Sequence, residues 1–316
     1  MKRIKIANTD LELSPIGLGT VNAGLSWDHE EAAKIFENYL AAGGNLIDTA
    51  HVYSDWVEGE VARAERVIGE WIRSRKKRDD FILMTKGGHP RMNSMEVSRL
   101  SKEEMTKDLN SSLEKLGVDY IDIYFYHRDD VKRTVEELIE TMEDFRRAGK
   151  IRYYGCSNWT TSRMKEADTY CKSKGYRGFV ANQDMFNIGV RHMKPYPDPT
   201  MVVCDPEMLE YHRNSDNLLM PYMGVCSGFF HILKAKGLEA VKSSCYNTEG
   251  NLKIADGICK LCEEKGYSIT QALLGFFGIQ DFDVLPLASA DNQEQLAELV
   301  KTLSMEFDAK DYGFLK

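Results

Sequence analysis

The regular alternation of short apolar runs with longer amphipathic segments is the feature that most constrains how this chain folds. Eight apolar runs of strand length occur along it, at residues 16–20, 45–49, 81–86, 120–127, 151–157, 179–183, 218–222 and 283–288. The segments between them carry apolar residues at i, i+3 and i+4, which is the spacing of one helix face. Alternating strands and helices predict a parallel sheet covered by helices, and eight repeats predict that the sheet closes into a barrel.

Four of the amphipathic segments show the signals of helix ends. They span residues 29–43, 59–75, 101–117 and 135–149. Acidic residues gather at the start of the first and third segments, where the helix dipole favours negative charge, and three of the four segments meet a glycine at the far end. We therefore predict an α/β fold, a (β/α)8 TIM barrel formed by a single domain of residues 1–316. A short N-terminal hairpin, turning at residues 8–10, is expected outside the barrel.

Composition excludes several other classes of protein. The net charge of −8 argues against a nucleic-acid partner, because phosphate binding requires a basic surface. The 7 cysteines are an odd number scattered along the chain, which predicts reduced thiols rather than a disulfide framework. No signal-peptide core and no apolar run of about 18 residues is visible, so we expect a cytoplasmic protein without a membrane partner, either a monomer or a homo-oligomer.

Polar side chains stand where three neighbouring strands are expected to end. Asp48, Lys86 and His127 end the second, third and fourth apolar runs, and Tyr53 lies five residues beyond Asp48. Taken singly, each residue has a plain structural explanation, such as a helix cap or barrel packing. The active site of such a barrel lies at the C-terminal ends of its strands, so we expect the four side chains to converge there.

Reduction of a carbonyl needs this combination of groups, because it requires a hydride on carbon and a proton on oxygen. A tyrosine is a weak acid, with an ordinary pKa of about 10, and a neighbouring ammonium lowers that pKa. A carboxylate holds the ammonium in place and balances its charge. A histidine can hold the substrate oxygen. We assign Tyr53 as the proton donor, with Lys86, Asp48 and His127 in the other three roles.

The segments GGNLIDTAHVY, ILMTKG, DYIDIYFYHRDD and GCSNW resemble the signature blocks of the aldo-keto reductase superfamily, in order and at similar spacing. The resemblance extends from IGLGT to DNQEQLAE, which is nearly the whole chain. It implies a (β/α)8 barrel and a catalytic tetrad whose positions match Asp48, Tyr53, Lys86 and His127. It also implies hydride transfer between NAD(P)(H) and a carbonyl or alcohol.

The same resemblance implies a set of cofactor-binding residues. The positions that match the nicotinamide site are Asp48, Ser157, Asn158, Gln183 and Tyr222. Those that match the ribose and pyrophosphate contacts are Gly19, Thr20, Val225, Ser227 and Gly228. Those at the adenosine end are Ser289, Asp291, Gln295 and Glu298. No GxGxxG segment follows the first apolar run, so a Rossmann-type site is not expected.

The adenosine end favours NAD(H) over NADP(H). Ser289 and Gln295 stand where many NADPH-preferring members of the superfamily carry basic residues, and Asp291 adds a negative charge. A carboxylate can bond a ribose hydroxyl but repels a 2′-phosphate. A basic residue from another loop, Lys234 or Lys236, is the alternative that would restore NADPH binding.

The substrate is expected to be a small carbonyl compound or a sugar-like molecule. With His127, Trp27 and Trp159 are the predicted substrate-binding residues, and aromatic rings beside polar groups suit a sugar, polyol or glycoside. The longest irregular stretch, at about 188–205, is expected to form a pocket wall. No metal is expected, because Cys259-x-x-Cys262 lies within an amphipathic helix pattern and lacks a second pair.

Two other functions stay open at this stage. Some members of the superfamily act as redox-sensing partners of channels, so a non-catalytic NAD(P)H-binding regulatory subunit is one alternative. A barrel lyase that uses Lys86 as a Schiff-base nucleophile is the other. A protonated Lys86 beside Asp48 would oppose the second alternative.

Overall fold

A computed structural model describes residues 1–75 and 77–315 and shows eight parallel strands in one sheet. The strands are β3 (Gly17–Gly19), β4 (Leu46–Asp48), β5 (Ile82–Gly87), β6 (Ile121–Tyr126), β7 (Ile151–Ser157), β8 (Ala181–Gln183), β9 (Leu218–Leu219) and β10 (Leu287–Ala288). Each of the eight predicted segments overlaps one of these strands, and β5 extends one residue beyond its segment, so the strand prediction is confirmed. The last two strands are shorter than the apolar runs that predicted them.

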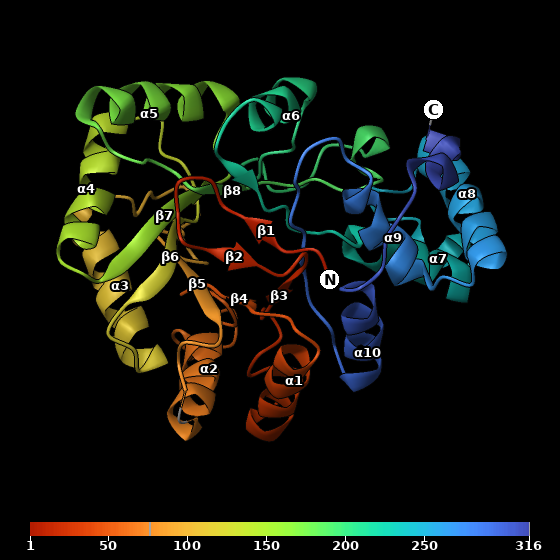
Figure 1. Ribbon diagram of the computed structural model, residues 1–316, viewed down its shortest axis with the longest axis horizontal. Coiled ribbons are helices and arrows are strands. Elements are labelled where there is room, and N and C mark those ends of the chain that lie inside the picture. The colour runs from red at the N-terminus through yellow and green to blue at the C-terminus, as the bar shows by residue number, and fades with distance from the viewer. Residues whose placement is uncertain (76, 316) are drawn as a thin grey trace.

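Helices alternate with these strands and surround them (Figure 1). The α-helices are α1 (His29–Ala41), α2 (Arg63–Ser74), α3 (Lys102–Leu116), α4 (Val135–Arg147), α5 (Thr161–Lys174), α6 (Pro206–Arg213), α7 (Phe229–Lys236), α8 (Glu249–Lys265), α9 (Ile269–Gly278) and α10 (Gln293–Thr302), with 3-10 turns η1 (Val190–His192), η2 (Cys226–Gly228), η3 (Leu238–Val241) and η4 (Ala309–Leu315). Side-chain caps define several helix starts: Asp28, Ser101 and Thr134 each accept a bond from the backbone amide three residues later. The four predicted helical segments are confirmed as α1 to α4.

The sheet closes on itself and forms a barrel. Its strands run in the order β10-β3-β4-β5-β6-β7-β8-β9, with parallel pairing throughout. A further parallel bridge joins Leu219 of β9 to Val284, and the amide of Leu285 donates to the carbonyl oxygen of Leu219 at 2.9 Å. These contacts link the two edge strands, so the predicted (β/α)8 arrangement is confirmed.

An antiparallel hairpin, β1 (Ile4–Lys5) and β2 (Glu12–Leu13), covers the N-terminal end of the barrel. In Figure 1 it lies in front of the strands, at the centre of the ring of helices. Its apolar side chains pack in one cluster with inward-facing residues of the barrel, including Met84 and Phe125. The predicted hairpin is thus confirmed, and it closes the end of the barrel opposite the polar strand ends.

The close packing of α2 against α3 generates a test of the fold. A Cβ atom at Gly69 of α2 would lie 1.9 Å from the backbone oxygen of Lys115 and 2.9 Å from Cα of Leu116, at the end of α3. Backbone atoms cannot move aside as a flexible side chain can. We therefore expect Gly69→Ala to lower the free energy of unfolding by about 2 kcal/mol or more in urea titrations.

Gly313→Ala in η4 is the matched control, because a Cβ atom added at this exposed residue would meet nothing within 4 Å. We expect its free energy of unfolding to stay within about 0.5 kcal/mol of the wild-type value. Equal stability of the two variants would contradict the packing of α2 on α3 described here.

Candidate active site

The four polar residues that were predicted to converge lie together at one end of the barrel. Asp48 is the last residue of β4, Lys86 lies near the end of β5, and His127 directly follows β6. Tyr53 comes from the loop after β4, whose backbone is tied to the sheet where the amide of His51 donates to the carbonyl oxygen of Lys86. Parallel strands end at the same edge, and that common edge brings these side chains together.

Lys86 is the central group of the cluster. Its Nζ lies 2.9 and 2.8 Å from the two carboxylate oxygens of Asp48. The same atom lies 2.8 Å from the carbonyl oxygen of Thr49 and 3.2 Å from the hydroxyl of Tyr53. The side chains of Lys86 and Asp48 are only 2% and 3% exposed. Because an ammonium carries three protons, these partners use all of its hydrogen-bonding capacity.

The environment of the cluster determines its protonation. Burial alone would lower the pKa of Lys86, but the Asp48 carboxylate and Tyr53 raise it above its usual value, so the side chain stays charged. Burial raises the pKa of Tyr53, and the Lys86 ammonium offsets only part of that increase. The expected net lowering of the Tyr53 pKa therefore does not occur, because desolvation of the hydroxyl outweighs the attraction of the ammonium.

His127 stands beside this pair as a neutral group. Burial lowers its pKa well below the usual value, and His89, Arg128 and Lys86 lower it further. Its ring contacts the ring of Tyr53 edge-on, with a centroid distance of 5.9 Å, and the ring of His89 at 4.9 Å. A neutral imidazole has one N–H and one lone pair, so His127 can still donate a hydrogen bond to a substrate oxygen.

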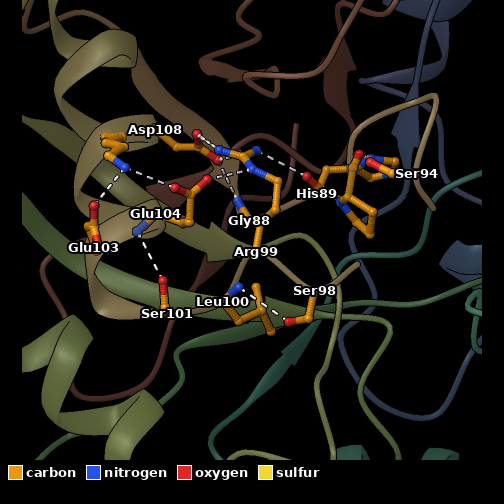
Figure 2. Close-up of polar contacts among 12 residues, drawn as sticks. Gly88, His89, Ser94, Ser98, Arg99, Leu100, Ser101, Glu103, Glu104 and Asp108 are labelled. Carbon is orange, nitrogen blue, oxygen red and sulfur yellow. Dashed lines mark hydrogen bonds and ion pairs between the residues drawn. The ribbon is translucent and has the colours of Figure 1, made fainter. Parts of the chain in front are cut away.

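The loop between β5 and α3 holds His89 in this position (Figure 2). Arg99 donates to the carboxylates of Glu104 and Asp108 and, at 3.1 Å, to the carbonyl oxygen of His89. Asp108 also accepts a bond from the amide of Gly88 at 2.9 Å. The backbone that follows Lys86 is thereby fixed to α3, which limits the movement of this side of the site.

A cavity of about 840 Å³ opens at the C-terminal ends of the strands and includes all four tetrad residues in its lining. The other predicted cofactor residues that line it are Ser157, Asn158, Gln183, Tyr222, Val225, Ser227, Gly228, Ser289, Asp291, Gln295 and Glu298. Segments from β4 to α10 thus contribute to one continuous space. Its volume lies in the range of small-molecule and cofactor sites.

Two predicted cofactor residues at the end of the first barrel strand do not line this cavity. Gly19 pairs with Asp48 in the sheet, and Thr20 is fully buried. The Thr20 hydroxyl donates to the carbonyl oxygen of Asp48 at 2.9 Å. Both residues therefore support the backbone that carries Asp48.

The two tryptophans expected at the substrate do not reach the cavity either. Trp27 and Trp159 are fully buried in the apolar layer between strands and helices. Their indole N–H groups donate to backbone oxygens, that of Trp27 to Ala290 at 2.8 Å and that of Trp159 to Arg128 at 3.3 Å. Neither tryptophan therefore presents a ring face to the cavity, and the expectation of a sugar-like substrate loses the support of these two residues.

A group of amide and hydroxyl side chains around Gln183 lies beside the tetrad. The Nε2 of Gln183 donates to Asp48 at 3.0 Å, while its Oε1 is buried and has no hydrogen-bond partner within residues 1–75 and 77–315. Ser157 donates to the carbonyl oxygen of Gln183 at 2.6 Å, and the hydroxyl of Tyr222 donates to Asn158 at 2.6 Å. A buried acceptor without a partner is costly, and a carboxamide N–H entering the cavity would satisfy it.

The far end of the cavity is acidic. Asp291, Glu294 and Glu298 all contribute to its lining there. The carboxylate of Asp291 accepts a bond from Asn22 at 2.8 Å, and its amide donates to Gln295 at 2.7 Å. Neither of the two lysines named as an alternative source of positive charge, Lys234 and Lys236, lines the cavity.

Arg128 lines the cavity next to His127, although it was not among the predicted site residues. It donates to the carbonyl oxygen of His127 at 3.0 Å and to the hydroxyl of Thr200 at 2.9 Å. Its position directly after a strand-end histidine was the available signal. Met201 beside it also lines the cavity, as expected if the loop at 188–205 forms a pocket wall.

The burial of the Lys86–Asp48 pair generates a stability prediction. Lys86→Met removes the cation and leaves a carboxylate that is 3% exposed without its counter-charge. We expect the free energy of unfolding at pH 7 to fall by about 3–5 kcal/mol in urea titrations.

The double variant Asp48→Asn with Lys86→Met should recover part of this loss, because it leaves no unpaired charge in the interior. A loss below about 1 kcal/mol in the single variant would show that Asp48 is not held as an ion in the folded protein.

No group of three or more His, Cys, Asp or Glu side chains within residues 1–75 and 77–315 has the geometry to hold a metal ion. All seven cysteines are free thiols, and Cys259 and Cys262 lie within α8. No helix in the part of the chain that the structure covers is long and apolar enough to cross a membrane.

Comparison with known proteins agrees with the geometry. An NADP(+) aryl-alcohol dehydrogenase of Phanerodontia chrysosporium is 27% identical over 335 residues, covering 96% of this chain and 82% of the relative. An aldo-keto reductase of Emericella nidulans is 30% identical over 337 residues, covering 99% and 80%. The crystal structure of the thermostable aldo-keto reductase Tm1743 shares the fold with a TM-score of 0.73, at 22% identity over 100% of this chain and 98% of that one. The model of the aldo/keto reductase family matches residues 15–316, and the chain belongs to this family of nicotinamide-dependent oxidoreductases.

Proposed function

We propose that this protein transfers hydride between a nicotinamide cofactor and a carbonyl or alcohol, with Tyr53 as the group that exchanges the proton. One observation carries the proposal. Lys86 contacts the Asp48 carboxylate and the Tyr53 hydroxyl at once, at 2.8 and 3.2 Å, in a cavity that His127 also lines. This arrangement can hold and move a proton at a defined oxygen atom.

The residues around the tetrad fit a nicotinamide. The Oε1 of Gln183, which has no hydrogen-bond partner in the described part of the chain, is an acceptor for the carboxamide N–H, and Ser157 bonds the backbone oxygen of the same residue. The Tyr222 side chain lines the same part of the cavity and offers an aromatic ring for stacking. When bound there, a nicotinamide supplies the hydride for reduction or accepts it in oxidation.

The chain's own residues handle the proton. In the reducing direction, Tyr53 donates its proton to the substrate oxygen, and the Lys86 ammonium stabilises the phenolate that remains. The neutral His127 can donate its N–H to the same oxygen and orient the carbonyl. Asp48 keeps the ammonium in place throughout, because both of its oxygens accept bonds from Lys86.

The two alternative functions fit less well. A Schiff-base lyase needs a neutral amine, whereas the pKa of Lys86 is raised and all three of its protons are engaged. A purely regulatory cofactor-binding subunit does not require Lys86, Tyr53 and His127 to face one space. Measurable turnover with an aldehyde would exclude it.

We further propose NADH as the preferred cofactor. The adenosine end of the cavity carries the carboxylates of Asp291, Glu294 and Glu298, with no Lys or Arg beside them in its described lining. A 2′-phosphate there would meet repulsion, whereas the ribose hydroxyl of NADH can donate to a carboxylate. The Phanerodontia relative is named for NADP(+), so this acidic end would mark a difference between the two proteins.

For the substrate we propose an aromatic aldehyde or the corresponding alcohol. The described lining of the cavity includes Met201 and Met223, which offer apolar surface, and the buried Trp27 and Trp159 are not available to stack on a sugar. The names of the aryl-alcohol relatives agree with this choice. A panel of aromatic aldehydes, aliphatic aldehydes and keto-sugars tests it, and higher kcat/KM for the sugars would reject it.

The role of Tyr53 generates the first functional prediction. Because its hydroxyl is the one at 3.2 Å from Lys86, Tyr53→Phe should lower kcat for aldehyde reduction by about 10² to 10⁴. The dissociation constant of the cofactor, measured by fluorescence titration, should change less than about threefold, since the ring remains. A kcat within a few-fold of wild type would remove Tyr53 from the mechanism.

The proposed preference for NADH generates the second functional prediction. We expect kcat/KM for NADH to exceed that for NADPH at one saturating substrate concentration. Gln295→Arg combined with Asp291→Asn should move the ratio toward NADPH by about tenfold or more, because it removes one repulsion and adds one charge-assisted bond.

Lys234→Arg on α7 is the control, because that residue does not line the cavity and the substitution keeps its charge. Its ratio of kcat/KM for NADH to kcat/KM for NADPH should match the wild-type ratio. A tenfold wild-type preference for NADPH would overturn the assignment of NADH.

A further inference from the structure

A buried carboxylate that forms no ion pair within residues 1–75 and 77–315 lies beside the nicotinamide end of the cavity. Asp184 directly follows Gln183, is fully buried, and does not line the cavity itself. Its Oδ1 accepts the backbone N–H of Asn158 at 2.5 Å, and its Oδ2 accepts the side-chain amide of Asn182 at 2.9 Å. This buried acid is held by N–H donors rather than by a cation.

Asn158, whose backbone N–H donates to Asp184, connects several segments of the site. Asn158 has a left-handed backbone with φ of 61°, which costs free energy in a residue other than glycine and needs support from its surroundings. Its Oδ1 accepts bonds from the Tyr222 hydroxyl at 2.6 Å and from the amide of Val202 at 3.0 Å. Its Nδ2 donates to the carbonyl oxygen of His127 at 3.1 Å and to Ser157 at 3.0 Å.

These four bonds use the full capacity of the Asn158 side chain, so in this structure it connects segments of the protein. It joins the ends of β6, β7 and β9 and the loop that contains Val202. The direct amide contact left for a cofactor at this point is Gln183, whose Oε1 has no partner within the described residues.

We propose that Asp184 is a positioning residue that sets the nicotinamide end of the cavity through Asn158. The ionised carboxylate accepts the backbone N–H of Asn158 and the side-chain N–H of Asn182 together. Protonation removes the negative charge and turns one carboxyl oxygen into a donor and a weaker acceptor, so these bonds weaken and the left-handed turn loses part of its support. The inference rests on the proposed function, in that it assumes that a nicotinamide cofactor occupies the cavity.

The surroundings make this carboxylate responsive near neutral pH. Burial raises the pKa of Asp184 to about 7, although its N–H donors and Arg128 lower it. Four other titratable groups lie around it, namely Cys156, Cys204, Tyr222 and His212, and their pKa values lie outside the range from pH 5.5 to 8.5. Burial raises the pKa values of Cys156, Cys204 and Tyr222 well above their usual values, and burial lowers the pKa of His212, which contacts Asn182, to about 4.

The test is a fluorescence titration of the protein with NADH between pH 5.5 and 8.5. In wild type, we expect the dissociation constant to fall by about five- to tenfold as the pH rises through 7, because a charge-assisted bond is stronger than a neutral one. Asp184→Asn should bind NADH with the weaker, low-pH affinity across the whole range. Its KM for NADH should rise by the same factor, while kcat at saturating NADH should change less than about threefold.

Asp168→Asn is the matched control. Asp168 on α5 is also a partly buried acid whose pKa is raised by burial, but it bonds Tyr211 and does not line the cavity. Its pH dependence of NADH binding should follow wild type. If wild type shows no pH dependence, or if Asp184→Asn keeps it, the inference is overturned while the proposed function stands. No binding of NADH or NADPH at any pH would overturn both.

Two further measurements test the inference if Asp184→Asn folds poorly. One is calorimetry of NADH binding to wild type, and the other is the pH dependence of stability. Calorimetry at pH 7 in buffers of different ionisation enthalpy should show proton release when NADH binds to wild type, and no release would overturn the inference. The folded protein keeps the Asp184 proton up to about pH 7, whereas the unfolded chain releases it near 3.8. Wild type should therefore lose stability relative to Asp184→Asn as the pH rises from 4 to 7.

Discussion

The buried ion pair between Lys86 and Asp48 is the interaction on which the rest of the site depends. Both side chains are at most 3% exposed, so neither charge can be left without the other. The pair survives in the interior because its remaining donors and acceptors are satisfied by Thr49, Gln183 and Tyr53. Each of these partners is held by the barrel, so the proton-handling groups are positioned by strand ends rather than by flexible loops alone.

Desolvation and Coulomb attraction act in opposite directions on Tyr53, and desolvation is the larger effect. The result is a tyrosine that keeps its proton at neutral pH and can donate it. His127 is also neutral, because its buried ring lies beside His89 and two cations. The tetrad therefore consists of one charged pair and two neutral donors, which is a suitable arrangement for placing a proton on a carbonyl oxygen.

The barrel and the positions of the tetrad could be predicted because they depend on periodicity. Parallel strands must end at one edge, so polar residues at the ends of three consecutive apolar runs have to converge. The direction of side chains on loops is not periodic, and there the predictions were less accurate. Trp27 follows the first strand and Trp159 follows the fifth, yet both rings turn into the layer beneath the helices.

Residues that act through hydrogen-bond networks also could not be predicted from the sequence pattern. Asp184 looks like any polar residue after a short strand, and its role emerges only because Asn158 adopts a left-handed turn above it. Arg99 is similar, since nothing in its local sequence indicates that it ties the backbone after Lys86 to α3 (Figure 2). Such contacts depend on which side chains meet across elements, and this information is available only in the folded structure.

The pH dependence of kcat for aldehyde reduction, measured at saturating cofactor and substrate, tests the central account most directly. In the proposed mechanism, reduction needs the protonated form of Tyr53. Because the pKa of that hydroxyl is raised, the rate should be constant from about pH 6 to 9 and fall only at higher pH. Because His127 stays neutral, no change should occur near its usual pKa of about 6.5. A rate that declines between about pH 6 and 8 would contradict the account, because it would assign the proton to a group other than the buried tyrosine beside Lys86.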